Sequence, residues 1–290
     1  MRIDRQLQKK MLTFQRNEIT EYHIYRRLAR MARKKDNRDV LNQIAKDELS
    51  HSKVWKEYTQ KNVKPAKLKI WFFVIVSRLL GYTFAIKLME RGEEEAENDY
   101  EKLADKVENI DSIIDEENKH EEMLIDMLEE ERLQYAGSMV LGLNDALVEL
   151  TGVLAGLTLA LQNTQLIALS GLITGIAAAL SMGASEYLST KSEKTIKNPV
   201  KASVYTGTAY IITVILLILP YLVLENYYFC LAMTLFIAVL VIAFFNYYIS
   251  VAKDESFKKR FWEMAILSLS VAAFSFLIGF VMRQFLGVDL

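Results

Sequence analysis

The chain has 290 residues, with 35 basic and 36 acidic side chains that are unevenly distributed. Residues 1–137 hold 26 basic residues, 27 acidic residues and all three histidines, whereas residues 138–290 hold nine residues of each sign. This contrast excludes a single uniform soluble domain, and the near-zero charge of both halves argues against nucleic-acid binding. The single cysteine, Cys230, excludes a disulfide framework and a thiolate zinc cluster, and the polar start MRIDRQLQKK predicts no cleavable secretory signal.

Four segments of the first half have apolar residues at steps of three and four, which predicts four amphipathic helices. In each segment a carboxylate interrupts the apolar stripe: Glu18 in residues 3–33, Glu48 in 41–58, Glu93 in 86–107 and Glu117 in 110–127. Two of these interruptions are Glu-x-x-His motifs, Glu48/His51 and Glu117/His120, and this spacing puts both groups on one helix face.

The four interrupted stripes predict a metal site, because buried carboxylates are costly unless they are paired or bound to a cation. One glutamate from each of two helices, with Glu-x-x-His from each of two others, can hold a pair of metal ions inside a four-helix bundle. A single glutamate in a helical stripe is more often a solvated flank, so the prediction rests on the coincidence of all the motifs. The expected ligands are Glu18, Glu48, His51, Glu93, Glu117 and His120. Mixed carboxylate and imidazole ligation favours iron or manganese over zinc or copper.

Two further glutamates, Glu21 and Glu97, lie one turn beyond Glu18 and Glu93 on the same faces, where extra metal ligation and simple exposure are equally compatible with the pattern. Tyr25 and Tyr100 are compatible with hydrogen bonding to the ligands or with plain core packing.

The stretch Leu68–Met89 is long enough to cross a membrane, but Arg78 and Lys87 interrupt it. If it crossed, the first two helices would lie on the opposite side of the membrane from the last two, and the metal site could not assemble. We therefore expect a packed or interfacial helix that connects the two helix pairs and can touch the bilayer.

The second half contains five apolar runs of roughly the ~20 residues that a membrane-spanning helix needs. They are Ser138–Gln162, Leu166–Ser189, Tyr205–Leu224, Tyr227–Ile249 and Phe261–Met282. Lysine and arginine are concentrated in the second and fourth connections, which the positive-inside rule places in the cytoplasm. The sequence thus predicts a multi-pass protein of the cell membrane with residues 1–137 in the cytoplasm and the C-terminus outside.

Ionisable residues inside spanning helices are candidates for function. Asp145 and Glu149 share one face of the first run, and Met182 and Glu186 share one face of the second, at similar depths from the cytoplasmic end. Carboxylates with a thioether suit a transition metal. The alternatives to a functional role are that the neighbouring Asn144 only makes local hydrogen bonds and that the Glu186 side chain reaches the membrane–water interface. The pairs Gly152/Gly156 and Gly171/Gly175 permit close helix packing, within the chain or across a dimer.

Two resemblances follow from these motifs. Residues 3–133 resemble a rubrerythrin-type ferritin-like domain through Glu18, Glu48-Leu-Ser-His51, Glu93 and Glu117-Asn-Lys-His120. Residues 138–290 resemble the vacuolar iron transporter family through GLNDALVELTGVLAG and LSMGASEYLSTKS. The second resemblance implies a proton-coupled homodimer in which Asp145 and Met182 line the metal path, with Glu149 and Glu186 nearby. Plant members carry a glutamate-rich module between spans two and three, where this chain has only a short lysine-rich connection. Together the halves resemble the membrane-bound ferritin arrangement.

The sequence therefore predicts an all-α protein with a ferritin-like di-metal bundle (residues 1–137) and a five-span membrane domain (residues 138–290). The expected function is export of Fe(II), and of Mn(II) as a second substrate, from the cytoplasm. The bundle, with a di-iron or Fe/Mn centre, is expected to collect or oxidise the metal. One alternative is a membrane-anchored di-iron oxidase or peroxidase without transport, and another is a bundle that senses iron and gates the path.

Overall fold

The computed structural model describes residues 5–32, 34–101, 110–126, 135–193, 197–253 and 255–286. Within these ranges, side chains are described except at residues 6, 93–101, 111, 121, 122, 125, 126 and 286. The described part consists of helices and connections without a strand, so the prediction of an all-α protein is confirmed for it. The chain forms two compact units, an N-terminal unit (Met1–Glu130) and a C-terminal unit (Glu131–Leu290).

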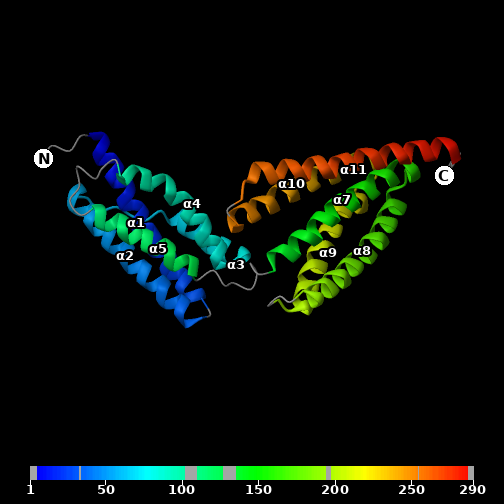
Figure 1. Ribbon diagram of the computed structural model, residues 1–290. Helices are drawn as coiled ribbons and strands as arrows, with labels where there is room; N and C mark the ends of the chain where they lie inside the picture. Colours follow the sequence, from blue (N-terminus) through cyan, green and yellow to red (C-terminus); the bar gives the residue numbers. More distant parts are fainter. Residues whose placement is uncertain are drawn as a thin grey trace. The chain divides into compact units, whose positions relative to one another are not determined.

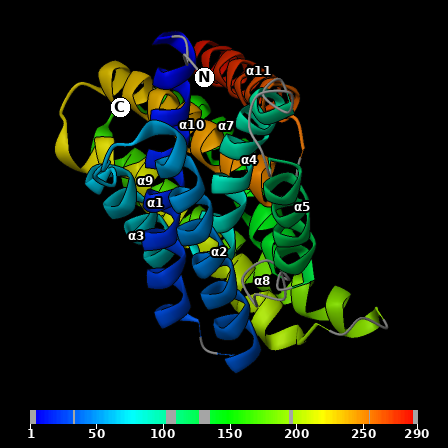
Figure 2. The same ribbon diagram turned by 90° about the vertical axis from the view of Figure 1, so that its left-hand side faces the viewer.

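The N-terminal unit contains five described helices (Figure 1), which are α1 (Arg5–Met31), α2 (Lys35–Thr59), α3 (Lys67–Leu80), α4 (Tyr82–Glu101) and α5 (Ile110–Asp126). Helices α1 and α2 run side by side as a long hairpin, as both views show (Figures 1 and 2). Helix α5 packs against α2 and α4, and α3 packs against α1 and α4. The four segments with interrupted stripes are therefore α1, α2, α4 and α5.

Two apolar clusters form the core of this unit. The larger one contains side chains from all five helices, including Tyr25, Ile44, Phe73 and Met89. The smaller one joins α1, α2 and α5 through Phe14, Trp55, Ile113 and neighbours. Along α1, α2 and α5, the stripe carboxylates fall in the sequence gap between these two clusters. The apolar stripes thus fix the rotation of the helices and direct the interrupting polar groups inward.

The stretch Leu68–Met89 is not one helix in the structure. Gly81 has φ 100° and ψ 152°, a conformation that only glycine adopts easily, and it separates α3 from α4. The expected packed helix is therefore α3, which is too short to span a membrane, and the helix with Glu93 begins at Tyr82 instead of Ile86. Glycine at position 81 was the signal for this break.

The C-terminal unit contains five long apolar helices (Figure 1), α7 (Ala136–Leu161), α8 (Thr164–Ser192), α9 (Pro199–Val223), α10 (Tyr227–Lys253) and α11 (Phe257–Leu286). All five are long and apolar enough to cross a membrane, which supports a multi-pass membrane protein and confirms the five predicted runs. Helix α7 is central in this unit, because it contacts each of the other four.

Small residues and buried hydroxyls join these helices. A side chain at Gly279 of α11 would collide with the backbone carbonyl of Gly156 in α7, and one at Gly175 would meet Val214 of α9 at 2.7 Å. The small-residue pairs of α7 and α8 therefore serve packing within the chain. Hydrogen bonds between hydroxyls add to this packing, such as the 2.6 Å contact of Thr158 with Tyr221.

Candidate metal site

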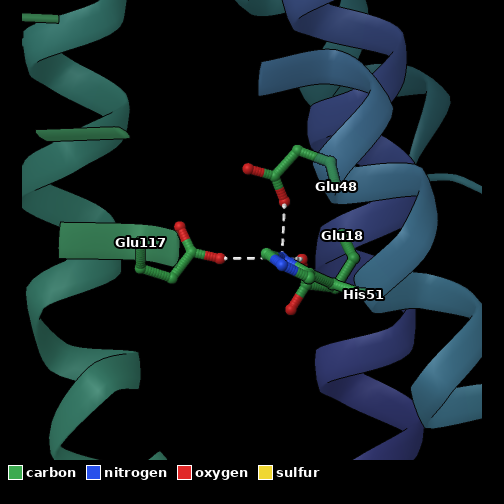
Figure 3. Close-up of side chains that lie close together, drawn as sticks. All are labelled: Glu18, Glu48, His51 and Glu117. Atoms are coloured by element: carbon green, nitrogen blue, oxygen red, sulfur yellow. Dashed lines mark ion pairs between the residues drawn. The ribbon is translucent and has the colours of Figure 1, made fainter. Parts of the chain in front are cut away.

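Four of the predicted ligands meet inside the N-terminal unit. Glu18 of α1, Glu48 and His51 of α2, and Glu117 of α5 each offer one ligand atom, and these atoms all lie within 4.8 Å of one another. Figure 3 shows Glu117 approaching from α5 toward the group that α1 and α2 contribute. The first three side chains are buried, and Glu117 is 15% exposed. This group brings together residues that are up to 99 positions apart in the sequence.

The two histidines are related symmetrically to two of the carboxylates. Nδ1 of His51 lies 3.1 Å from Glu117 Oε1 and 3.9 Å from Glu48 Oε2. Nδ1 of His120 lies 3.4 Å from the other oxygen of Glu117 and 3.6 Å from the other oxygen of Glu48. Each of these two carboxylates thus presents one oxygen to each histidine, and the imidazole centroids are 6.0 Å apart. In this arrangement the two carboxylates and the two imidazoles could hold metal together.

The far side of each imidazole is held by a further carboxylate. Nε2 of His51 lies 2.8 Å from Glu116 Oε2, and Nε2 of His120 lies 3.2 Å from Asp47 Oδ2. A proton on Nε2 that is donated to a carboxylate leaves the lone pair on Nδ1 available to a metal. Each carboxylate immediately precedes the glutamate of one motif and holds the histidine of the other. Asp47 and Glu116 are not among the predicted site residues, although the acidic pairs Asp47-Glu48 and Glu116-Glu117 were an available signal in the sequence.

A test of whether these residues fit a metal comes from the Nδ1 atoms themselves. Both are buried, and among the described residues neither makes a hydrogen bond, although carboxylate oxygens surround them. Buried polar atoms are rarely left in this state. A cation between the Nδ1 atoms and the oxygens would satisfy both, and carboxylate and imidazole donors suit iron or manganese. The donor set therefore fits a metal centre.

The charges in the site shift its protonation equilibria. Burial disfavours the charged imidazolium of His51, but the carboxylates of Glu117 and Glu18 outweigh this and raise its pKa to about 11. Burial would raise the pKa of Glu117, but His120 and His51 lower it to about 2. The pKa of Glu48 is raised well above its ordinary value by burial and by the neighbouring Glu117 and Glu18 carboxylates. In the metal-free site, protons bound to His51 and Glu48 thus supply the positive charge that a metal ion would otherwise bring.

The remaining predicted residues of this site have different surroundings. Glu18 also accepts a hydrogen bond from the Trp55 indole at 3.1 Å. Glu21 is buried, lies outside the four-residue group, and accepts a hydrogen bond from Lys69 of α3 at 2.8 Å. Tyr25 donates a hydrogen bond to Glu90 of α4 at 3.0 Å, and this partner was not among the predicted residues. Glu93, Glu97 and Tyr100 lie outside the described side chains.

The predicted path residues lie on α7 and α8 of the C-terminal unit. Asp145 and Glu186 are half-buried and Glu149 is exposed on α7, while Met182 is half-buried on α8. The carboxylates do not form a metal-binding group like the one in the N-terminal unit, as far as the described residues show. Instead they bond to neighbouring helices: Ser138 of α7 donates to Glu186 at 2.5 Å, and Tyr210 of α9 donates to Glu149 at 2.7 Å. Tyr210 was missed because nothing in the sequence shows which span faces Glu149.

Comparison with known proteins bears on the C-terminal unit. No curated protein matches the chain. Residues 136–198, which comprise α7, α8 and the connection to α9, match the VIT family. Together with the five apolar helices of this unit, the match indicates membrane transport of metal ions.

Proposed function

We propose that the protein is a transporter of divalent metal, with Fe(II) as the main substrate and Mn(II) as a second one, that exports the ion from the cytoplasm. The observation that carries the proposal is the union in one chain of a buried carboxylate–histidine group and a five-span unit with a VIT match. An anchor alone has no use for Asp145 and Glu149 within an apolar helix, because ionisable groups there are costly.

In this proposal the N-terminal unit is a cytoplasmic, ferritin-like bundle that binds metal before transport. Glu18, Glu48, His51, Glu117 and His120 would hold the ions, with Glu93 as the expected sixth ligand. A dinuclear iron centre bound there would supply storage or oxidation of Fe(II). Asp47 and Glu116 keep the imidazoles oriented, and Trp55 orients the Glu18 carboxylate.

The C-terminal unit would pass the ion along Asp145, Met182, Glu149 and Glu186. Tyr210 and Ser138 fix the carboxylates of Glu149 and Glu186, so that each has a defined direction before an ion arrives. Proton exchange on these carboxylates is the proposed coupling. The exposed position of Glu149 on a spanning helix supports a water-filled path or a second copy of the chain beside α7, as in a homodimer.

The test is Fe(II) flux into proteoliposomes under a pH gradient, with the intact chain and with Asp145→Asn. This substitution preserves the shape of the side chain and removes its charge, so we expect it to abolish flux. Glu193→Gln, which removes a carboxylate at the end of α8, is the matched control and should leave flux unchanged. Absence of flux from well-folded intact protein, with Fe(II) oxidation or peroxide reduction retained, would favour the membrane-anchored oxidase or peroxidase.

A further inference from the structure

Helix α3 has an exposed apolar face that the metal site does not explain. Leu68 is 85% exposed, Trp71 67%, Phe72 51% and Leu79 69%. At 100° per residue these positions, with the half-buried Ile75, form one continuous stripe along the helix. The opposite face of α3, with Ile70, Phe73 and Ser77, is buried against the bundle. Helix α3 is therefore apolar on both faces, although it belongs to the charged half of the protein.

The charges around this stripe have one sign. Residues 58–89 hold six basic residues and no acidic one, in a half of the chain that holds 26 basic and 27 acidic residues in total. Lys64, Lys67 and Arg78 are exposed. Lys67 and Arg78 fall on the same border of the apolar stripe, because eleven residues make almost three full helical turns. An apolar face bordered by lysine and arginine, with a tryptophan at the border, is the pattern of a helix that lies in a membrane interface.

A pocket adjoins the basic border of the stripe. It has a volume of about 360 Å³ and lies between α1 and α3, lined by His23, Arg27, Lys67, Ile70, Trp71 and Val74, with Pro65 at its edge. A lining that combines two permanent cations, Arg27 and Lys67, with apolar side chains matches a phospholipid at the level of its phosphate. Trp71 contributes to both the pocket and the stripe, so the two features are continuous.

Few residues of the sequence separate the N-terminal unit from the first span. Helix α5 ends at Asp126 and α7 begins at Ala136. A connection of this length reaches at most about 35 Å even when it is fully extended. The bilayer that holds the five spans is thus present at high effective concentration for any membrane-binding face of the N-terminal unit.

From these observations we infer that α3 is an interfacial membrane anchor: its stripe of Leu68, Trp71, Phe72, Ile75 and Leu79 inserts among the headgroups of an anionic phospholipid bilayer, and the pocket beside Trp71 takes a headgroup phosphate. The occupant is the membrane that surrounds the spans. This inference rests on the five spans and on α3, and it does not depend on metal transport, so it can fail or succeed separately from the proposed function.

The test uses the full chain in lipid nanodiscs, with spin labels at single introduced cysteines. The only native cysteine, Cys230, is buried, and it can be replaced by alanine to confirm that it takes no label. Phe72→Cys and Leu68→Cys report on the stripe, and Lys56→Cys, on the exposed face of α2, is the matched control. We expect labels on α3 to be reached by oxygen and protected from a water-soluble nickel complex, whereas the control label is open to nickel. The protection should increase when phosphatidylglycerol replaces part of the phosphatidylcholine.

Two outcomes would overturn the inference. Equal nickel access at Phe72→Cys and Lys56→Cys would place the stripe in water. Strong spin–spin broadening between labels at position 72, in discs that hold two chains, would show that a second copy of the chain covers the stripe. Tryptophan fluorescence, which needs no introduced cysteine, also tests whether the stripe inserts into the bilayer. Brominated lipid should quench the part of the tryptophan emission that is lost in Trp71→Phe, and an unquenched Trp71 component would contradict insertion.

Discussion

The carboxylates behind the two imidazoles determine which nitrogen faces the candidate metal site. Asp47 lies at His120 Nε2 and Glu116 at His51 Nε2, so each helix with a Glu-x-x-His motif holds the histidine of the other. Outer carboxylates of this kind fix the tautomer and direction of a ligand without touching the ion. The exchange between α2 and α5 means that neither motif is complete alone.

We predict that Asp47→Asn weakens metal binding about 10- to 100-fold, because the amide no longer selects the tautomer with a free Nδ1. Anaerobic titration of the metal-free full chain with Fe(II) or Mn(II) measures the effect. Glu57→Gln, an exposed change on the same helix, is the control and should bind like the unchanged protein. Equal affinity of Asp47→Asn and the unchanged protein would remove Asp47 from the site.

The protonation of the site predicts how the metal-free protein responds to pH. The raised pKa of His51 contributes stability that is fully present below pH 6.5 and is lost as pH rises toward 11. The raised pKa of Glu48 contributes stability that is fully present below pH 4.5 and is lost as pH rises, whereas the lowered pKa of Glu117 contributes stability that is present above pH 4.5 and lost toward pH 2. The metal-free bundle should therefore be most stable near pH 4.5 and lose stability as the pH moves away from it in either direction.

The measurement is thermal unfolding of the metal-free chain, followed through the buried Trp55. We expect the transition temperature to fall as pH rises above 6.5, and saturating Mn(II) to remove this fall, because the metal replaces the protons. Replacement of His51 by glutamine should flatten the pH dependence, whereas His23→Gln, outside the site, should preserve it. A transition temperature that rises with pH above 6.5 would contradict the protonation of His51 and Glu48.

At the scale of the elements, the break at Gly81 is what gives α3 its separate direction. A side chain at this residue would be forced into a backbone conformation that is nearly exclusive to glycine. We predict that Gly81→Ala destabilises the N-terminal unit by about 1–3 kcal/mol. Gly92→Ala in α4 is the control, since a methyl group there has open space and should stabilise the helix by up to about 1 kcal/mol. Urea unfolding of the metal-free chain compares the two, and equal effects would show that the break carries no strain.

Features that depend on residues close in the sequence could be predicted, whereas contacts between residues far apart in the sequence mostly could not. The four stripes of the first half and the five apolar runs are local patterns, and α1, α2, α5 and α7–α11 follow them closely. The gathering of Glu18, Glu48, His51 and Glu117 could also be expected, because each was an inward position of its own helix. Contacts that depend on which helices are neighbours could not, and these include Tyr210 with Glu149 and Tyr25 with Glu90. The close contact of Gly156 with Gly279 of α11 could not be predicted for the same reason, because it depends on which helices pack together.

At the scale of the whole molecule, the proposed division of labour separates capture of the ion from its passage. We predict that Glu48→Gln raises the Fe(II) concentration needed for half-maximal flux, because the bundle no longer collects the ion, and leaves the maximal flux intact. Flux in proteoliposomes with the N-terminal unit facing the Fe(II) solution measures both quantities, with Glu57→Gln as the control. Loss of maximal flux in Glu48→Gln would instead make the bundle an obligatory gate, as the sensing hypothesis requires.

The ion pair between Lys69 and Glu21 gives helix α3 a second partner besides the core. Lys69 leaves the flank of α3 and reaches a buried carboxylate one turn from Glu18, so the same short helix contacts the surroundings of the metal site and presents the apolar stripe. Binding equilibria that share an element are reciprocal: if seating of α3 in lipid changes metal affinity by some factor, metal must change the lipid affinity of α3 by the same factor. Iron loading would then change the affinity of the N-terminal unit for the bilayer surface. For the same reason, an N-terminal unit separated from the membrane would have a different metal affinity from the unit in the intact protein.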